Sequence, residues 1–285
     1  MRRQVPNPFL GQVRVGALAQ ATVSQAQLLR PYPHFEGVNA VATSWAASTY
    51  HSLQAKAEKR FSRGFYLLFS YTYSKLMDYG IGAFGGEVVG GVGFQNNHDL
   101  ASEWASSALD QTHRAVINWI YEVPVAGGLP KPVRAVLGGW QVSGIYSSLT
   151  GGPLGVSAAV NNTFSQGGGQ RPNWNGVNPD TGSRNPDRWF DAAPFTNPAP
   201  YTFGNAPRTY NGARSDATRQ LDLTLSKSLS IFDKLQAQFR AEVFNITNTA
   251  RFAPPGQVFG NPQFGVVSAQ NNQPRIVQFA LKLTR

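Results

Sequence analysis

The stretch KLQAQFRAEVFNITNTARF, residues 234–252, carries the pattern that decides the fold. From Leu235 onward its apolar and polar residues alternate, so that Phe239 and Val243 fall on one side of an extended chain and Arg240 falls on the other. Successive side chains of a β-strand point to opposite faces of a sheet. The period of two therefore predicts a strand with one apolar face and one polar face.

The same alternation recurs along the chain and predicts an all-β, antiparallel fold. Residues 1–47 are expected to form a lead-in segment, and the remainder, 48–285, a sheet of about seven strands. We expect these strands near residues 48–60, 64–76, 113–123, 138–158, 217–229, 235–246 and 275–284.

The connections between these strands alternate between short and long, which is the second clue. Three are short or moderate and three are long. The short ones are residues 60–64, 124–137 and 230–234, and the long ones are residues 77–112, 159–216 and 247–274. Short turns on one side and long loops on the other are typical of an outer-membrane β-barrel with periplasmic turns and extracellular loops.

A barrel of this kind accounts for the two unlike faces, because one face meets lipid and the other lines a wet lumen. We expect the lipid-facing set to include Phe65, Leu67, Phe69, Tyr71, Ile117, Trp119, Leu221, Leu223, Phe239, Val243, Phe279 and Leu281. We expect the lumen-facing set to include Gln54, Lys56, Glu58, Asn118, Gln236, Gln238, Arg240, Glu242, Gln278 and Lys282. The seven expected strands are fewer than the eight of the smallest single-chain bacterial barrels, so we expect a partial barrel.

Composition excludes several other classes of protein. The net charge of +10 comes from scattered Lys and Arg residues rather than from a basic strip interleaved with stacking aromatics, so no nucleic-acid partner is expected. The absence of cysteine excludes disulfide frameworks and Cys-ligated zinc. No apolar run reaches 18 residues, which argues against a transmembrane helix, and the first residues lack the apolar region of an export signal.

A soluble β-rich module is the alternative interpretation, since its strands also alternate but turn their apolar side chains inward. Such a module could bind carbohydrate through aromatic residues of the long loop 159–216, such as Trp174 and Trp189. In the barrel interpretation the same loop is extracellular and mobile, and Trp174 and Trp189 are its candidate ligand contacts. The aromatic-rich apolar faces and the one-sided loop lengths favour the membrane.

No catalytic, cofactor-binding or metal-binding residue is expected. One loop gathers acidic and histidine residues, but their spacing matches no strong metal template, and no G-x-S-x-G motif marks a nucleophile. The residues of that loop are His98, Asp99, Glu103, Asp110 and His113. Arg240 and Glu242 are expected to form ordinary lumen-facing charge pairs with neighbouring strands.

Several blocks of the sequence resemble a known family. They are LQAKAEKRFSRGFYLLFSYTYSKLMD (53–78), LDQTHRAVINWIYEVP (109–124), GWQVSGIYSSLTGGPL (139–154), LDLTLSKSLSI (221–231) and LQAQFRAEVFNITNTARF (235–252). In this order they resemble the C-terminal barrel of TonB-dependent receptors, in particular the Oar-like group with carboxypeptidase-regulatory-like domains. The resemblance covers nearly the whole chain.

The resemblance implies a bacterial outer-membrane receptor that moves a bulky ligand inward. Such receptors close 22 strands around a plugged lumen. The seven strands expected here, without a plug or a TonB box, correspond to a C-terminal fragment that ends on Thr284 and Arg285 where such barrels finish on an aromatic residue. The implied partners are outer-membrane lipid, the missing N-terminal plug and barrel portion, and TonB only through that portion.

Overall fold

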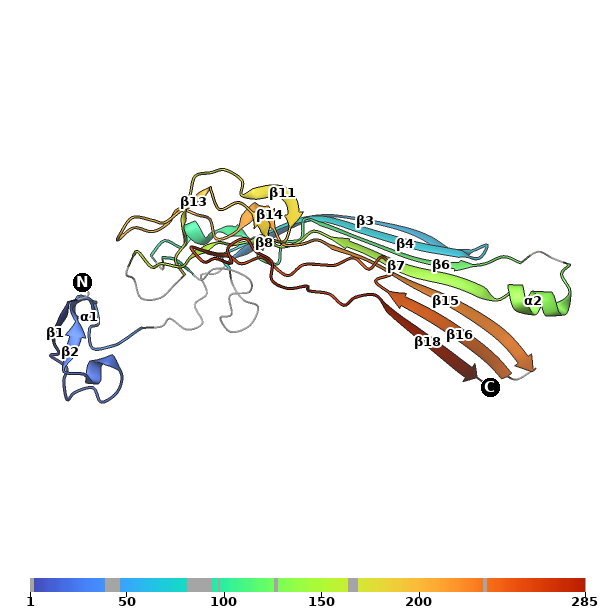
Figure 1. The fold of residues 1–285 in the computed structure, drawn as a ribbon, viewed down its shortest axis with the longest axis horizontal. Coiled ribbons are helices and arrows are strands. Elements are labelled where there is room, and N and C mark those ends of the chain that lie inside the picture. Colours follow the sequence, from blue (N-terminus) through green and yellow to red (C-terminus); the bar gives the residue numbers. More distant parts are fainter. Residues whose placement is uncertain are drawn as a thin grey trace. The chain divides into compact units, whose positions relative to one another are not determined.

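A computed structural model describes residues 3–38, 47–80, 94–96, 98–125, 128–163, 169–232 and 235–284 (Figure 1). The chain divides into two compact units, Met1–Trp45 and Ala46–Arg285. The elements of the first unit are β1 (Gln4–Pro6), the short 3-10 helix η1 (Ala17–Ala19), β2 (Thr22–Ser24) and α1 (Gln25–Leu28).

A two-stranded antiparallel sheet holds the first unit together. β1 pairs with β2, with Val5 opposite Val23. Asn7 fastens the connection between them, because its side-chain amide donates to the carbonyl oxygens of Leu18 and Gln20 at 2.7 Å each. The residues expected to be a lead-in therefore include a small folded element.

One eight-stranded antiparallel sheet dominates the described part of the second unit. Seven long strands lie side by side in the order β18-β16-β15-β7-β6-β4-β3, and the two-residue strand β5 (Ala105–Ser106) pairs with the end of β4. The long strands are β3 (Ser48–Ser62), β4 (Phe65–Asp78), β6 (His113–Glu122), β7 (Trp140–Leu149), β15 (Thr218–Phe232), β16 (Leu235–Phe244) and β18 (Ile276–Thr284). The expected all-β, antiparallel fold is confirmed.

The sheet is open. β3 and β18 are its two edges, and within the described residues each pairs with a long strand on one side alone. The barrel is accordingly not closed, as expected for a partial barrel.

Local sequence fixes the short connections. Arg63 and Gly64 join β3 to β4 with φ angles of 51° and 74°, and two consecutive positive φ angles belong to the tight hairpin turns that match strand twist. Between β6 and β7 lies the helix α2 (Lys131–Leu137), which has Pro132 in its first turn and ends before Gly138. The described parts of the long connections 79–112, 150–217 and 245–275 gather at the opposite end of the strands (Figure 1).

The strand expected over 138–158 is shorter than the sequence predicts. β7 ends at Leu149, and β8 (Pro153–Leu154) leaves the sheet to pair with β14 (Tyr210–Arg214). The backbone packs so closely at Gly151 that a Cβ atom there would lie 1.9 Å from the carbonyl oxygen of Ser215. The alternation continues through this sequence, but the close approach of a distant segment ends the strand.

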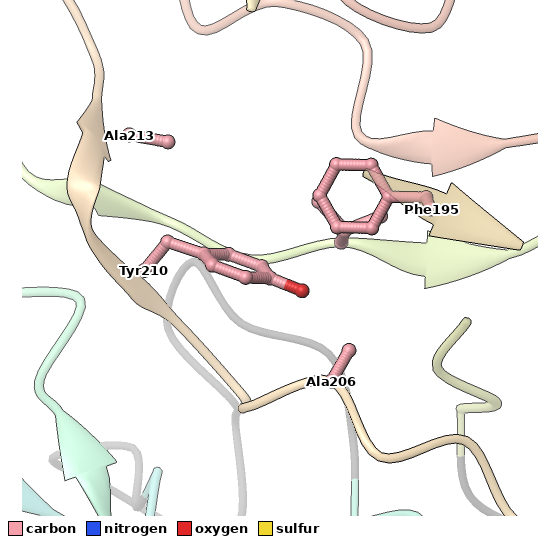
Figure 2. Close-up of a cluster of buried hydrophobic side chains, with 5 residues drawn as sticks. Phe195, Ala206, Tyr210 and Ala213 are labelled. Carbon is pink, nitrogen blue, oxygen red and sulfur yellow. The ribbon is translucent and has the colours of Figure 1, made fainter. Parts of the chain in front are cut away.

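The described parts of the long connections fold together, and the mobility expected for the loop 159–216 stays a prediction. They carry short strands and two clusters of buried apolar side chains, one of which contains Phe195 and Tyr210 (Figure 2). The additional elements are the 3-10 helix η2 (Ala101–Glu103), β9 (Ser157–Ala158), β10 (Asn173–Trp174), β11 (Asp180–Asn185), β12 (Arg188–Phe190), β13 (Phe195–Thr196) and β17 (Val258–Phe259). We call this region the loop cluster.

Candidate membrane interface and loop cluster

Strand register sorts the side chains of the sheet into two faces, because directly opposed residues of antiparallel strands point to the same side. One row of opposed residues crosses all seven long strands of the described sheet. It consists of Lys59, Leu67, Trp119, Gly144, Leu223, Val243 and Val277. We call the side that contains this row the apolar face and the other side the polar face.

The register places all twelve of the residues expected to face lipid on the apolar face. Phe69 lies opposite Ile117, Leu221 opposite Tyr146, and Phe239 opposite Leu281. Large apolar side chains on this face are open to solvent, with Phe279 69% and Leu281 68% exposed. Contact of these side chains with lipid stays a prediction.

Aromatic side chains border the apolar face near both ends of its strands. Toward the short connections, the rings of Phe65 and Tyr121 meet edge to face at 6.4 Å. Toward the long connections, the Tyr71 hydroxyl forms a 2.8 Å hydrogen bond with Nδ1 of His113. Two aromatic belts flanking an aliphatic band are typical of a sheet that spans a bilayer.

Gly144 makes room for Trp119 on the apolar face. A Cβ atom at Gly144 would lie 2.3 Å from Cζ2 of Trp119 and 2.7 Å from Cδ2 of Leu223. The indole therefore crosses the glycine and reaches the next strand. This contact explains why a glycine occupies a position on the apolar face.

The polar face carries all ten residues expected to face a lumen. Two ion pairs on this face run along a strand, with Nη2 of Arg240 2.5 Å from Oε1 of Glu242 and Nζ of Lys56 3.0 Å from Oε2 of Glu58. The expectation that Arg240 and Glu242 pair with neighbouring strands is therefore wrong: both belong to β16.

The middle of the polar face is less polar than its two sides. Ile145 lies opposite Asn118 on one neighbouring strand and Asp222 on the other. These residues border a hollow of about 310 Å³, which Ile120 and Thr224 also line. The hollow combines apolar walls with a carboxylate and an amide.

Lys227 is a cation on the apolar face, and carbonyl oxygens at the end of α2 accept hydrogen bonds from its ammonium group. Its ammonium group donates to the carbonyl oxygens of Ala135 at 2.7 Å and Val136 at 2.9 Å, and also to that of Gly138. It lies 5.2 Å from the ring centroid of Trp140. The carbonyls at the C-terminal end of a helix carry partial negative charge, so α2 stabilises the buried ammonium.

Four arginine–carboxylate pairs in which the carboxylate is buried hold the loop cluster together. Three of the carboxylates lie between the end of β4 and the start of β6, and all four arginines come from the connection between β7 and β15. The pairs are Asp78–Arg208 at 2.5 Å, Glu103–Arg171 at 2.6 Å, Asp110–Arg214 at 2.6 Å, and Asp216–Arg184. Three pairs therefore tie the two connections to each other.

The acidic and histidine residues noted in the sequence do not come together in one site. Glu103 and Asp110 are buried and bind arginines, whereas His113 begins β6 and contacts Tyr71. Asp99 accepts from the backbone N–H of Ser102. The described residues contain no group of three such side chains placed to hold a metal ion.

The two tryptophans of the expected ligand loop pack inside the loop cluster. Trp189 is 7% exposed, and its indole N–H donates to the carbonyl of Arg214 at 2.8 Å. Trp174 is partly buried, donates to the carbonyl of Val177, and meets the ring of Tyr210 edge to face. Trp189 is thus not presented to a ligand, because its ring fills the core of the loop cluster.

Tyr210 has an unusual electrostatic environment. Burial raises the pKa of its phenol, an effect that the nearby positive charge of Arg171 opposes in part. Among the described residues its hydroxyl has no hydrogen-bond partner. The sequence analysis did not predict a structural role for Tyr210, Arg171 or Arg208. The available signal was the presence of arginines in a Gly- and Asn-rich loop. Their carboxylate partners are far away in the sequence and are identified only by the structure.

A family model described as an outer membrane beta barrel domain matches residues 3–278. No curated protein and no solved structure matches the chain. Among the described residues, no helix has both the length and the apolar character needed to cross a membrane.

Proposed function

Because the chain belongs to the outer membrane beta barrel domain family, we propose that it works in transport across the bacterial outer membrane, where the family is located. Specifically, we propose that it forms the C-terminal barrel wall of a TonB-dependent receptor of the Oar-like type. It takes part in ligand uptake only as part of a complete barrel. Membership of this family disfavours the soluble carbohydrate-binding alternative.

The observation that carries this proposal is the open sheet with two unlike faces. Unpaired backbone groups at a sheet edge cost several kcal/mol each in hydrocarbon, so the edges at β3 and β18 require further strands in a membrane. Receptors of the type that the sequence resembles use 22 strands, and a seven-stranded segment would supply about a third of such a wall. The polar face would then line the lumen beside the plug.

The folded loop cluster fits the outer surface of such a receptor. In this arrangement the short connections are periplasmic and the long ones extracellular. A cluster held by buried ion pairs presents a shaped surface to an arriving ligand, and the hollow near Asp222 lies on the face that the ligand passes. Contact with TonB is made through the remaining portion of the receptor.

Uptake by living cells tests the proposal. We expect that deleting the gene in its own host abolishes accumulation of at least one bulky nutrient among labelled iron chelates, corrinoids and oligosaccharides. The same accumulation should stop when a protonophore removes the energy that TonB transmits. Accumulation that depends on the gene but is insensitive to the protonophore would contradict TonB dependence, and unchanged accumulation of every compound would contradict transport.

A further inference from the structure

The end of the sheet with the short connections carries an exposed surface that the proposed transport does not use. It consists of α2 together with Arg60 and Arg63 of the β3–β4 hairpin, and we call it the turn-end surface. Val136 is 67% and Leu137 52% exposed on α2, so the helix turns apolar side chains outward. An amphipathic segment of this kind, next to an apolar sheet face, needs a partner that is apolar on one side and polar on the other.

Contacts within the chain fix α2 beside the apolar face. Lys227 and Trp140 lie opposite each other in register on that face. Both reach the last turn of α2, since the indole N–H of Trp140 donates to the carbonyl of Val136 at 3.0 Å and Lys227 donates to the same oxygen at 2.9 Å. The exposed apolar side chains of α2 therefore continue the apolar face beyond its aromatic border.

Charge distinguishes the turn-end surface from the loop cluster. Arg60, Arg63 and Arg134 are exposed, and none of them has an ion-pair partner among the described residues. Nearby carboxylates are few: Glu58 is paired with Lys56, and Glu122 is the other described one at this end. In the loop cluster, by contrast, five arginines form ion pairs with carboxylates, whereas Arg251 and Arg275 donate to neutral oxygens. The turn-end surface consequently retains uncompensated positive charge.

We propose that the turn-end surface binds the headgroups of anionic phospholipids in the adjoining leaflet. Guanidinium groups pair with phosphate through two parallel hydrogen bonds, while Val133, Val136 and Leu137 enter the boundary between headgroups and acyl chains. The inference rests on the proposed contact of the apolar face with lipid. Each arginine near an anionic membrane surface strengthens vesicle binding by about fivefold.

The absence of cysteine from the chain makes a direct test available. The full chain carrying Val136→Cys is labelled with an environment-sensitive nitrobenzoxadiazole dye and added to vesicles. Vesicles of phosphatidylcholine alone are compared with vesicles containing phosphatidylglycerol. We expect a blue shift and quenching by nitroxide lipids with both, and binding that is stronger with phosphatidylglycerol and weakened by salt.

Charge-removing variants locate the effect. The Arg60→Gln/Arg63→Gln/Arg134→Gln variant should bind phosphatidylglycerol vesicles about a hundredfold more weakly than the parent, while binding phosphatidylcholine equally. Arg134→Gln alone should weaken binding about fivefold, whereas Arg188→Gln, which removes one exposed charge from the loop cluster, serves as the matched control and should have no effect. Equal losses for Arg134→Gln and Arg188→Gln would overturn the proposal.

A second labelled position distinguishes headgroup binding by the turn-end surface from lipid contact of the apolar face, on which that inference rests. The same dye at Leu67→Cys, on the apolar face opposite Trp119, should report an acyl environment. An acyl signal from Leu67→Cys with a water-like signal from Val136→Cys would overturn the headgroup site and leave the lipid contact of the face standing. A water-like signal at both positions would overturn both.

Discussion

Large apolar side chains are exposed on the sheet, whereas others are buried in the loop cluster. Phe279 in β18 is 69% exposed, whereas Phe195 in the loop cluster is 3% exposed. The loop cluster buries its aromatic side chains against one another, with the rings of Phe195 and Tyr210 edge to face at 5.6 Å. A surface of large apolar side chains on a folded sheet calls for a partner, and we predict that this partner is the bilayer.

Charged residues show the reverse contrast. In the sheet, the Lys56–Glu58 pair is open to solvent on the polar face, but in the loop cluster the side chains of Glu103 and Arg171 are buried. The loop cluster is therefore built like the interior of a soluble domain, with apolar clusters and enclosed ion pairs. We predict that lipid covers the apolar face of the sheet and that water meets its polar face.

Breaking a buried pair should have the largest effect. Arg171→Met leaves the carboxylate of Glu103 enclosed without its cation, and we expect the free energy of unfolding of the loop cluster to fall by about 3–5 kcal/mol. Denaturant titration followed by fluorescence of the buried Trp189 measures it. Lys56→Met, at the exposed pair, is the control and should change stability by about 0–1 kcal/mol. Similar losses at the two sites would remove the contrast between the regions.

A charge placed on the two faces of one strand sharpens the comparison within the sheet. Leu67 and Leu68 are neighbours in β4 and belong to the apolar and polar faces, opposite Trp119 and Asn118. In a complete barrel folded in phospholipid vesicles, Leu67→Arg should destabilise by about 2–4 kcal/mol because it places a cation in hydrocarbon. Leu68→Arg should be tolerated. Equal tolerance at both positions in urea titrations would count against the assignment of faces.

Filling the space over Gly144 should have an intermediate effect. The added methyl group of Gly144→Ala displaces the indole of Trp119, and overpacking of this kind costs about 1–3 kcal/mol. A shift of the Trp119 emission together with lower stability would report it. Gly37→Ala is the matched control, since a Cβ atom there has nothing within 4 Å. A neutral Gly144→Ala variant would show that Trp119 does not lie across the glycine.

The smallest effect is expected at Tyr210, and it depends on pH. Burial raises the pKa of the folded phenol, so the unfolded chain ionises first and stability falls as pH rises above the ordinary tyrosine pKa of about 10. Tyr210→Phe should be neutral or slightly stabilising at pH 7, because the hydroxyl has no partner among the described residues, and it should lessen the alkaline loss. An unchanged alkaline profile in the variant would assign that loss to other groups.

Alternation predicted the sheet because its physical cause is local. In β16, each residue from Leu235 to Phe244 has one of two faces to occupy, and the sequence itself records which face is apolar. Turn residues such as Gly64 also predict where strands end, as at the Arg63–Gly64 turn. At Gly151 the boundary comes from contact with Ser215, which lies far away in the sequence, so the alternation extended the predicted strand too far.

The loop cluster could not be predicted from such local patterns. Glu103 and Arg171 lie 68 residues apart, and neither belongs to a periodic segment. Gly-, Asn- and Pro-rich sequence indicated exposed loops, and the tryptophans in them suggested ligand contacts. Trp189 instead packs against Phe252 from a third connection, so its burial follows from the meeting of segments that are distant in the chain.

A nitroxide scan along β4 tests the central claim, that the apolar face meets lipid, most directly. Single cysteines from Phe65 to Thr72 are spin-labelled in outer-membrane preparations, and the accessibility of each label to oxygen and to a water-soluble nickel complex is measured. We predict that oxygen accessibility peaks at residues 65, 67, 69 and 71 and nickel accessibility at residues 66, 68, 70 and 72, because the faces alternate with a period of two. Reversed peaks, or accessibilities without this period, would contradict the account.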